Sequence, residues 1–214
     1  MKLEKSELSE IFKKYKSRLY KKGQILVYSG DLIEDIFYIS SGQVRQYFVS
    51  KDGDEITLFL HSVGFIFPLD SIFQVGVSEF DYEVMSESSI HKCSREFFVE
   101  QVISNLNMCS ECLRKSLYYS SVVSKKLSYS MIGDSKIRLL YAIDVLISRF
   151  GKVVDNKVEL TIPITQSDLA AHAGMARETV SREVSLLEKE LVINYEKKYL
   201  IIIDYRKFKE LLKL

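Results

Sequence analysis

Two arginines and a glutamate stand close together in the stretch from 165 to 191, TQSDLAAHAGMARETVSREVSLLEKEL. Arg177, Glu178 and Arg182 fall on one side of a helix, because they occupy positions i, i+1 and i+5 of a 3.6-residue period. An arginine can donate two hydrogen bonds to O6 and N7 of guanine, and a glutamate can accept one from the amino group of cytosine. The types and spacing of these side chains therefore fit contact with the base edges of DNA.

Two short helices separated by a tight turn are predicted to position these side chains. The first covers 166–173, and Thr165 can cap it with Asp168 three residues later, as in a capping box. Gly174 follows, where a left-handed cap needs no Cβ, and the second helix starts near 176 or 177 and continues to about 189. The buried stripe of the second helix is expected to consist of Val180, Val184, Leu187 and Leu191. This pattern is typical of a helix-turn-helix.

A β-hairpin, or wing, is predicted directly after the second helix. Residues 191–193 and 199–203 are apolar, and the residues from 194 to 198 between them are polar. The alternative is an ordinary pair of surface helices, in which Glu178 and Arg182 form an exposed ion pair that contributes about 0.3 kcal/mol. A wing beside arginine and lysine side chains favours DNA binding over that alternative.

The string from Arg177 to Arg182, RETVSR, resembles the recognition helix of the Crp–Fnr superfamily of transcription regulators. The resemblance extends over essentially the whole chain, and it implies double-stranded DNA and RNA polymerase as partners. Relatives that share the Glu-x-x-Ser-Arg spacing, present here from 178 to 182, bind half-sites that contain TGA. The side chains expected to contact DNA are Gln166, Ser167, Arg177, Glu178, Thr179, Ser181 and Arg182.

The composition is typical of a globular protein. Of the 214 residues, 47% are hydrophobic and 28% are charged, and the net charge is +1. No apolar run approaches the length of a membrane span and the first residues lack a signal-peptide pattern, so we expect a cytoplasmic protein with no membrane contact. The net charge neither supports nor opposes DNA binding, because local clustering of charge decides it.

No cofactor, metal site or catalytic group is expected, and hence no enzyme. The histidines at 61, 91 and 172 lie in different segments without metal-ligand spacing, and neither a Gly-rich phosphate loop nor a nucleophile elbow is present. Cys109 and Cys112 lie three residues apart on a predicted helix, so two chains together could offer them to a metal. Buried, unreactive thiols are the favoured interpretation.

The residues from about 16 to 95 form short β-rich runs. Glycines at 23, 30, 42, 53 and 64 punctuate them at nearly regular intervals, which predicts a barrel or jelly roll. Strands are expected at 36–39, 44–49, 56–60 and 90–93, with a turn at Asp52-Gly53 between the second and third. A helix from Leu3 to Tyr15 precedes them, with Leu8, Ile11 and Phe12 on its apolar side, and another follows near 95–102. The region looks like the β-roll effector domain of the superfamily.

Members of the superfamily that respond to cyclic nucleotides hold the ribose with Gly-Glu-Leu and the phosphate with Arg-Ser. Here Phe67 and Pro68 stand in place of Gly and Glu, Leu69 is retained, and Phe80-Asp81 stand in place of Arg-Ser. Without the arginine a phosphate loses its charge-assisted hydrogen bond, and the carboxylate of Asp81 repels it. We therefore expect no binding of cyclic AMP.

Two interpretations of this region remain open. An open pocket lined by Phe67, Phe73, Phe80 and Tyr82 would take an unidentified small-molecule effector of apolar or aromatic character. The favoured alternative is that these rings fill the roll as core. Ser124 matches a serine that reaches the nucleotide across the dimer in cyclic-AMP-responsive relatives, and here it is expected to be mainly a small interface residue. The effector candidates are Phe67, Pro68, Leu69, Phe80, Asp81, Tyr82 and Ser124.

A long helical pattern runs from about 105 to 132 and suits the helix through which superfamily members form homodimers. Gly133-Asp134 breaks it, and a helix at 135–150, a strand pair within 153–164 and a closing helix at 204–214 are expected to follow. The heptad seam of the long helix consists of Leu106, Leu113, Leu117, Leu127 and Met131.

The sequence thus predicts an α+β fold in three parts. Residues 1–104 form a cyclic-nucleotide-binding-like, jelly-roll-like β-roll effector domain, 105–133 the dimerisation helix, and 134–214 a winged helix-turn-helix DNA-binding domain. We expect a sequence-specific transcription regulator that acts as a homodimer on an inverted repeat, with a degenerate effector pocket. The alternative of another class is an effector-sensing β-roll module whose winged helix mediates protein interaction.

Overall fold

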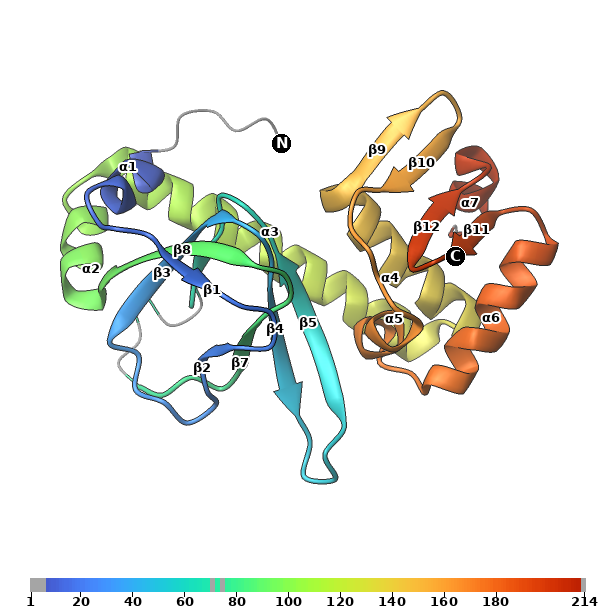
Figure 1. Ribbon diagram of the computed structural model, residues 1–214, viewed down its shortest axis with the longest axis horizontal. Helices are drawn as coiled ribbons and strands as arrows, with labels where there is room; N and C mark the ends of the chain where they lie inside the picture. Colours follow the sequence, from blue (N-terminus) through green and yellow to red (C-terminus); the bar gives the residue numbers. More distant parts are fainter. Residues whose placement is uncertain (1–6, 70–71, 74–75, 213–214) are drawn as a thin grey trace. The chain divides into compact units, whose positions relative to one another are not determined.

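The chain divides into two compact units, Met1–Ser120 and Ser121–Leu214, and each combines helices with antiparallel sheet (Figure 1). The computed structural model describes residues 7–69, 72–73 and 76–212. The division falls within helix α3 (Leu106–Ile132), so the domain boundary placed at 133 by the sequence stays a prediction. The α+β class expected from the sequence is confirmed.

Among the described residues, two four-stranded antiparallel sheets make up the β-rich part of the first unit. One sheet has the order β1 (Arg18–Tyr20), β8 (Ser88–Ser94), β3 (Asp35–Ser41) and β6 (Ile66–Phe67). The other has the order β2 (Ile25–Val27), β7 (Asp81–Val84), β4 (Val44–Val49) and β5 (Glu55–His61). All four strands expected from the sequence are present. The predicted hairpin is the pair β4–β5, whose burial alternates along β5 because successive side chains point to opposite faces.

The glycines predicted to mark turns do so. Those at 23, 30, 42, 53 and 64 all have φ between 86° and 94°, which favours glycine over any residue with a Cβ. Gly42 has a second constraint, since a Cβ added there would lie 2.0 Å from the hydroxyl oxygen of Ser88. The regular turn spacing in the sequence therefore reflects backbone geometry.

Helices α1 (Glu7–Lys13) and α2 (Arg95–Ile103) pack against the first sheet. The apolar side predicted for α1 is buried, and the ring of Phe12 lies 5.3 Å from that of Tyr38 and 5.6 Å from that of Phe98. The predicted helix began at Leu3, and residues 3–6 lie outside the described residues. These ring contacts join α1 to the sheet and to α2.

Helix α3 has one face on the core of the first unit and another face exposed. Met108, Cys112 and Tyr119 pack on that core, and burial raises the pKa of the Cys112 thiol to about 12. Cys109 is exposed, so the expectation of a buried thiol was wrong there: it shares the outer side of α3 with Leu106 and Leu113 at helical spacing. The predicted seam residues are between 58% and 82% exposed, namely Leu106, Leu113, Leu117, Leu127 and Met131.

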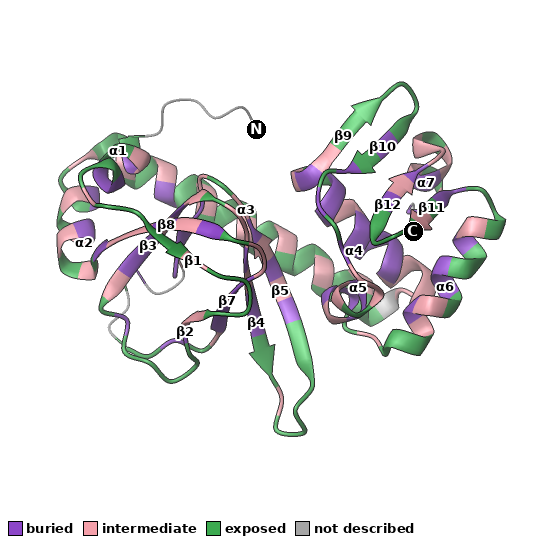
Figure 2. Ribbon diagram, in the orientation of Figure 1, coloured by how far each residue is buried: buried purple, intermediate pink, exposed green. Residues whose placement is uncertain are grey.

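In the part of the second unit that the structure describes, four helices follow α3 and one sheet has four strands. The helices are α4 (Ser135–Phe150), α5 (Gln166–Ala173), α6 (Arg177–Lys189) and α7 (Tyr205–Leu211). The sheet has the order β11 (Ile193–Glu196), β12 (Tyr199–Ile202), β10 (Lys157–Leu160) and β9 (Gly151–Val154). Asp134 caps α4 by accepting a hydrogen bond from the backbone N–H of Ile137 at 2.9 Å. Figure 2 shows buried bands along α4, which contacts both α5 and α6.

Two details of the wing differ from the sequence prediction. Leu191 was expected on the buried stripe of α6, but it is 68% exposed with a φ of 56°. The helix ends at Lys189, so Leu191 leaves the helical phase and Val192 takes the buried place. The turn is also shorter than predicted, because β11 continues to Glu196 and only Lys197 and Lys198, with φ of 51° and 72°, connect the strands.

None of the described helices is both long enough and apolar enough to cross a membrane.

Candidate functional site

The first helix of the helix-turn-helix is fixed at both ends by the residues that the sequence singled out. The hydroxyl of Thr165 accepts from the backbone N–H of Asp168 at 3.0 Å, and the carboxylate of Asp168 accepts from the backbone N–H of Thr165 at 2.8 Å. Gly174 ends α5 with a φ of 62°. The capping box and the left-handed cap thus set the direction in which the chain enters α6.

Helix α6 buries an apolar stripe and exposes a polar face. Val180, Val184 and Leu187 are at most 1% exposed, as predicted. Glu183 is only 6% exposed, which the sequence analysis missed. The available signal was its position beside the apolar stripe, one helical turn after Val180.

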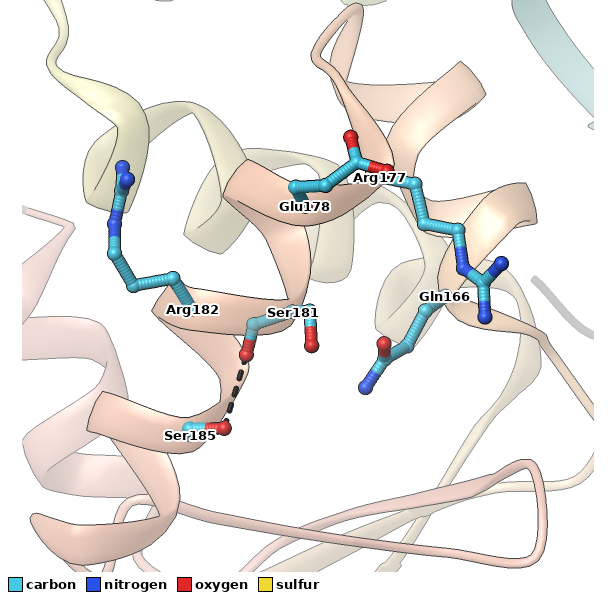
Figure 3. Close-up of a pocket in the computed structure, with 6 residues that line it drawn as sticks. All are labelled: Gln166, Arg177, Glu178, Ser181, Arg182 and Ser185. Carbon is cyan, nitrogen blue, oxygen red and sulfur yellow. Dashed lines mark hydrogen bonds between the residues drawn. The ribbon is translucent and has the colours of Figure 1, made fainter.

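An open concavity of about 430 Å³ lies over the polar face of α6 (Figure 3). Arg177 and Gln166 lie on one side of it and Arg182 leaves the helix on the opposite side, with Glu178 and Ser181 between them. The lining residues are Gln166, Arg177, Glu178, Ser181, Arg182 and Ser185. The structure therefore brings five of the seven predicted DNA-contacting residues together.

The remaining two candidates follow lining residues in the sequence and do not themselves line this concavity. Ser167 is exposed in the first turn of α5, and Thr179 is half-buried on α6. Ser185 lines it although it was not among the candidates, and its hydroxyl donates to the backbone carbonyl of Ser181 at 3.0 Å. Ser185 follows Ser181 by four residues, so helical spacing places both on one face.

The chemistry of the concavity suits an anionic polymer with hydrogen-bonding edges. It offers two guanidinium groups against one carboxylate, together with hydroxyl and amide groups. The N-cap residue Ala176 makes no side-chain hydrogen bond, so the first backbone N–H groups of α6 have no cap from its side chain. The positive end of the helix dipole lies at the same place. Donors for phosphate and for base edges are therefore available together.

The predicted effector region of the first unit contains a stack of aromatic rings. Phe67 is 0% and Tyr82 is 1% exposed, and their ring centroids lie 5.0 Å apart at an interplanar angle of 17°. The ring of Phe37 stacks on Phe67 at 5.1 Å. Further along, His61 stacks on Phe65 at 3.6 Å. These contacts are those of ring packing in a core.

Leu69 and Phe80 pack against the core cluster that contains these two rings, and the other effector candidates differ in exposure. Pro68 is buried, Leu69 and Phe80 are half-buried, and Ser124 is exposed on the part of α3 that belongs to the second unit. Phe73, which the sequence had placed beside them, is 55% exposed. Asp81 is 8% exposed, and its carboxylate accepts from the backbone N–H of Ser29 at 3.2 Å.

Tyr119 connects this packed region to α3. Its ring meets the rings of Phe59 and Phe65 edge-on, at centroid distances of 4.8 Å and 5.1 Å. The imidazole of His61 donates from Nε2 to the side-chain oxygen of Gln46 at 3.1 Å. The buried imidazole of His61 thus lies among aromatic rings from β5, β7 and α3.

Comparison with known proteins finds relatives for both units. Residues 17–105 match the cyclic nucleotide-binding domain, and residues 137–211 match the Crp-like helix-turn-helix domain. The chain is 25% identical over 207 residues to electron transport regulator A of Shewanella oneidensis, covering 94% of this chain and 80% of that protein. It is 26% identical over 183 residues to the cyclic AMP receptor protein of Thermus thermophilus, covering 84% and 80%. The structure of FixK2 from Bradyrhizobium japonicum is similar in fold, with a TM-score of 0.81, 14% identity and coverage of 94% and 98%.

Proposed function

Because the chain belongs to the Crp–Fnr family of DNA-binding transcription regulators, we propose that it binds an inverted-repeat DNA site as a homodimer and that its effector pocket is degenerate. The observation that carries DNA binding is the concavity on α6, where Arg177, Glu178 and Arg182 gather from one helical face. The N-terminal half of this helix is the part that meets base edges in the helix-turn-helix motif. We therefore call α6 the recognition helix.

The half-site is proposed to contain TGA. Glu178, Ser181 and Arg182 keep the spacing of relatives with that preference, and all three line the concavity. Arginine pairs with guanine and glutamate with cytosine, so the face can specify a G·C pair on either strand. Gln166, from α5, and Arg177 lie at the edge of the same surface, where they can contact base edges or phosphates.

The homodimer is proposed to form through the exposed side of α3. Its apolar residues repeat at heptad spacing and remain mostly exposed in the single chain, as at Leu106 and Met131, which are 82% and 76% exposed. A two-fold axis through α3 would present two recognition helices to one face of DNA. The half-sites would then lie about one helical turn, roughly 34 Å, apart. RNA polymerase is the second macromolecular partner in this proposal.

The effector pocket is proposed to be degenerate because its place holds packed rings. The Thermus relative is named for cyclic AMP, but this chain has Phe67, Pro68, Phe80 and Asp81 where nucleotide-binding members hold ribose and phosphate. A cyclic phosphate there would lose its arginine and face a carboxylate, at a cost of several kcal/mol out of about 8 kcal/mol for micromolar binding. The stacked rings of Phe67 and Tyr82 favour core over pocket.

Selection from random DNA sequences, followed by a gel-mobility shift, tests DNA binding. The expected outcome is enrichment of an inverted repeat with TGA half-sites. Enrichment of a direct repeat would contradict the dimer geometry. If no sequence is enriched, the alternative that the winged helix mediates protein interaction is favoured.

Calorimetric titration with cyclic AMP and cyclic GMP tests the degenerate pocket. No saturable heat is expected at micromolar nucleotide, and operator affinity should be the same with and without either nucleotide. Operator affinity should also survive refolding from denaturant, which removes any ligand carried through purification. Saturable heat that disappears in a Phe67→Ala variant would show that the pocket binds nucleotide after all.

A further inference from the structure

The first turn of α4 contacts the helix-turn-helix at three points. The hydroxyl of Ser135 donates to Oε1 of Glu183 at 2.6 Å, and Nζ of Lys136 donates to Oε1 of Glu190 at 2.8 Å. The guanidinium of Arg138 donates to the backbone carbonyl of Ala173 at 3.2 Å and to that of Gly174. One turn of helix therefore holds the middle of α6, its C-terminal end and the turn that precedes it.

Of these three contacts, the one at Glu183 leads on to a residue of the candidate DNA surface. The same Oε1 atom of Glu183 accepts from Nη2 of Arg182 at 3.3 Å. The side chain of Glu183 is 8% exposed, whereas that of Arg182 is 64% exposed. Burial of a carboxylate is unfavourable unless it is hydrogen-bonded, and these two donors supply the bonds. The buried carboxylate of Glu183 thus lies beside the exposed side chain of Arg182 and is held in place by Ser135.

We propose that Glu183 is a specificity-determining positioning residue, which is held by Ser135 and fixes the direction from which Arg182 approaches DNA. This inference rests on the proposed function, because it assumes that Arg182 contacts a base. A guanidinium has five N–H donors in a planar fork, so a bond from Nη2 to Glu183 leaves other donors for guanine.

Two physical effects give Glu183 this role. An exposed arginine has considerable rotamer freedom, which it loses on binding at an entropic cost. Contact with the buried Glu183 restricts Arg182 before DNA binds, so this cost is smaller. A carboxylate beside the guanidinium also repels phosphate, because both are anions. Arg182 is therefore steered from the DNA backbone toward the base edge.

The test measures affinity for the selected operator and for an operator changed at the base pair that depends on Arg182. Glu183→Gln keeps the shape of the side chain and an acceptor for Ser135 but removes the charge. It should reduce the preference for the selected base pair by about 2- to 10-fold, the range expected for one hydrogen bond. In an Arg182→Ala background it should cause no further loss of preference, because the two residues act together.

Glu190→Gln is the matched control. It removes one negative charge from the end of the same helix and so the ion pair with Lys136, but it does not alter the contact between Arg182 and Glu183. It should leave the preference unchanged. Ser135→Ala removes only the hydroxyl that holds Glu183, and it should reduce the preference in the same direction as Glu183→Gln.

Equal weakening of both operators by Glu183→Gln, or additive effects with Arg182→Ala, would overturn the inference and leave Glu183 a purely structural residue. Thermal unfolding of each variant shows whether the fold is retained. If Glu183→Gln does not fold, the same cycle with Ser135→Ala and Arg182→Ala decides the question. A wild-type protein that prefers no sequence would instead refute the proposed function.

Discussion

Among single residues, Arg182 offers the clearest distinction between contact with a base and contact with a phosphate. Arg182→Ala should weaken binding to the selected operator by about 1–3 kcal/mol and relax the preference at one base pair. The measurement is a gel shift on operators with each of the four base pairs at that position. Equal loss on all four would show that Arg182 contacts phosphate.

The recognition helix lacks a capping side chain at Ala176, where the structure has no side-chain hydrogen bond. Ala176→Ser supplies an acceptor for the backbone N–H groups of the first turn. It should raise the free energy of unfolding by about 0.5–1 kcal/mol, measured by urea denaturation in the absence of DNA. Ala171→Ser within α5 gains no cap, and it should be neutral or destabilising. A loss of stability at 176 would show that the first turn is already satisfied.

Single residues also show where sequence patterns stop being informative. The polar face of α6 with Arg177 and Ser181 was predictable, because charge and spacing are local properties. The hydrogen-bond partner of Glu183 was not predictable, since its hydroxyl donor, Ser135, lies 48 residues earlier in the chain. A polar residue beside an apolar stripe can be explained only when its distant partner is known.

At the scale of helices and strands, α3 carries a lysine whose protonation opposes folding. Burial, and then the charge of Arg138, lowers the pKa of Lys126 to about 8. An unfolded lysine has a pKa of about 10.4, so the unfolded chain binds this proton more tightly. The unfavourable contribution is complete below about pH 8 and disappears as the pH rises to about 10.

Lys126→Met should therefore stabilise the protein at pH 7 by about 1–3 kcal/mol, and the gain should fade toward pH 10. Urea denaturation at several pH values between 6 and 10 measures it. Lys125→Met, at the exposed neighbouring position, should show no such pH dependence. A gain of constant size from pH 6 to 10 would mean that methionine acts by packing alone.

Most elements were predictable because their signals are local. Apolar periodicity placed α4 at 135–150, and the glycine spacing placed the turns of the roll. The turn of the wing was predicted too long, because a positive φ is uncommon for lysine. A two-residue turn at Lys197 and Lys198 was therefore not expected. Aromatic side chains that alternate along strands occur in pockets and in cores alike. The stacking of Phe67 on Tyr82 could therefore not be predicted without knowing which rings they contact.

For the whole molecule, the exposed side of α3 is expected to decide the assembly state. The wild-type chain should sediment at micromolar concentration with twice its mass of 24.8 kDa. Leu117→Glu places a charge in the seam, where two copies would face each other across the two-fold axis, and it should yield monomer with little affinity for the inverted repeat. Leu19→Glu is the matched control, because Leu19 is 75% exposed on β1. A dimer that persists in the Leu117 variant would place the interface elsewhere.

The two-residue turn of the wing combines an unfavourable backbone conformation with two lysine side chains. Lys197 and Lys198 both occupy the left-handed region, at a cost of about 1 kcal/mol each relative to glycine. A lysine that neutralises a phosphate releases a condensed counterion, which adds about 0.9 to the slope of log affinity against log salt concentration. Replacing the pair by Asn-Gly should stabilise the fold while flattening that slope by one to two units. The two lysines of this turn would then make occupancy of the operator more dependent on the ionic strength of the cell.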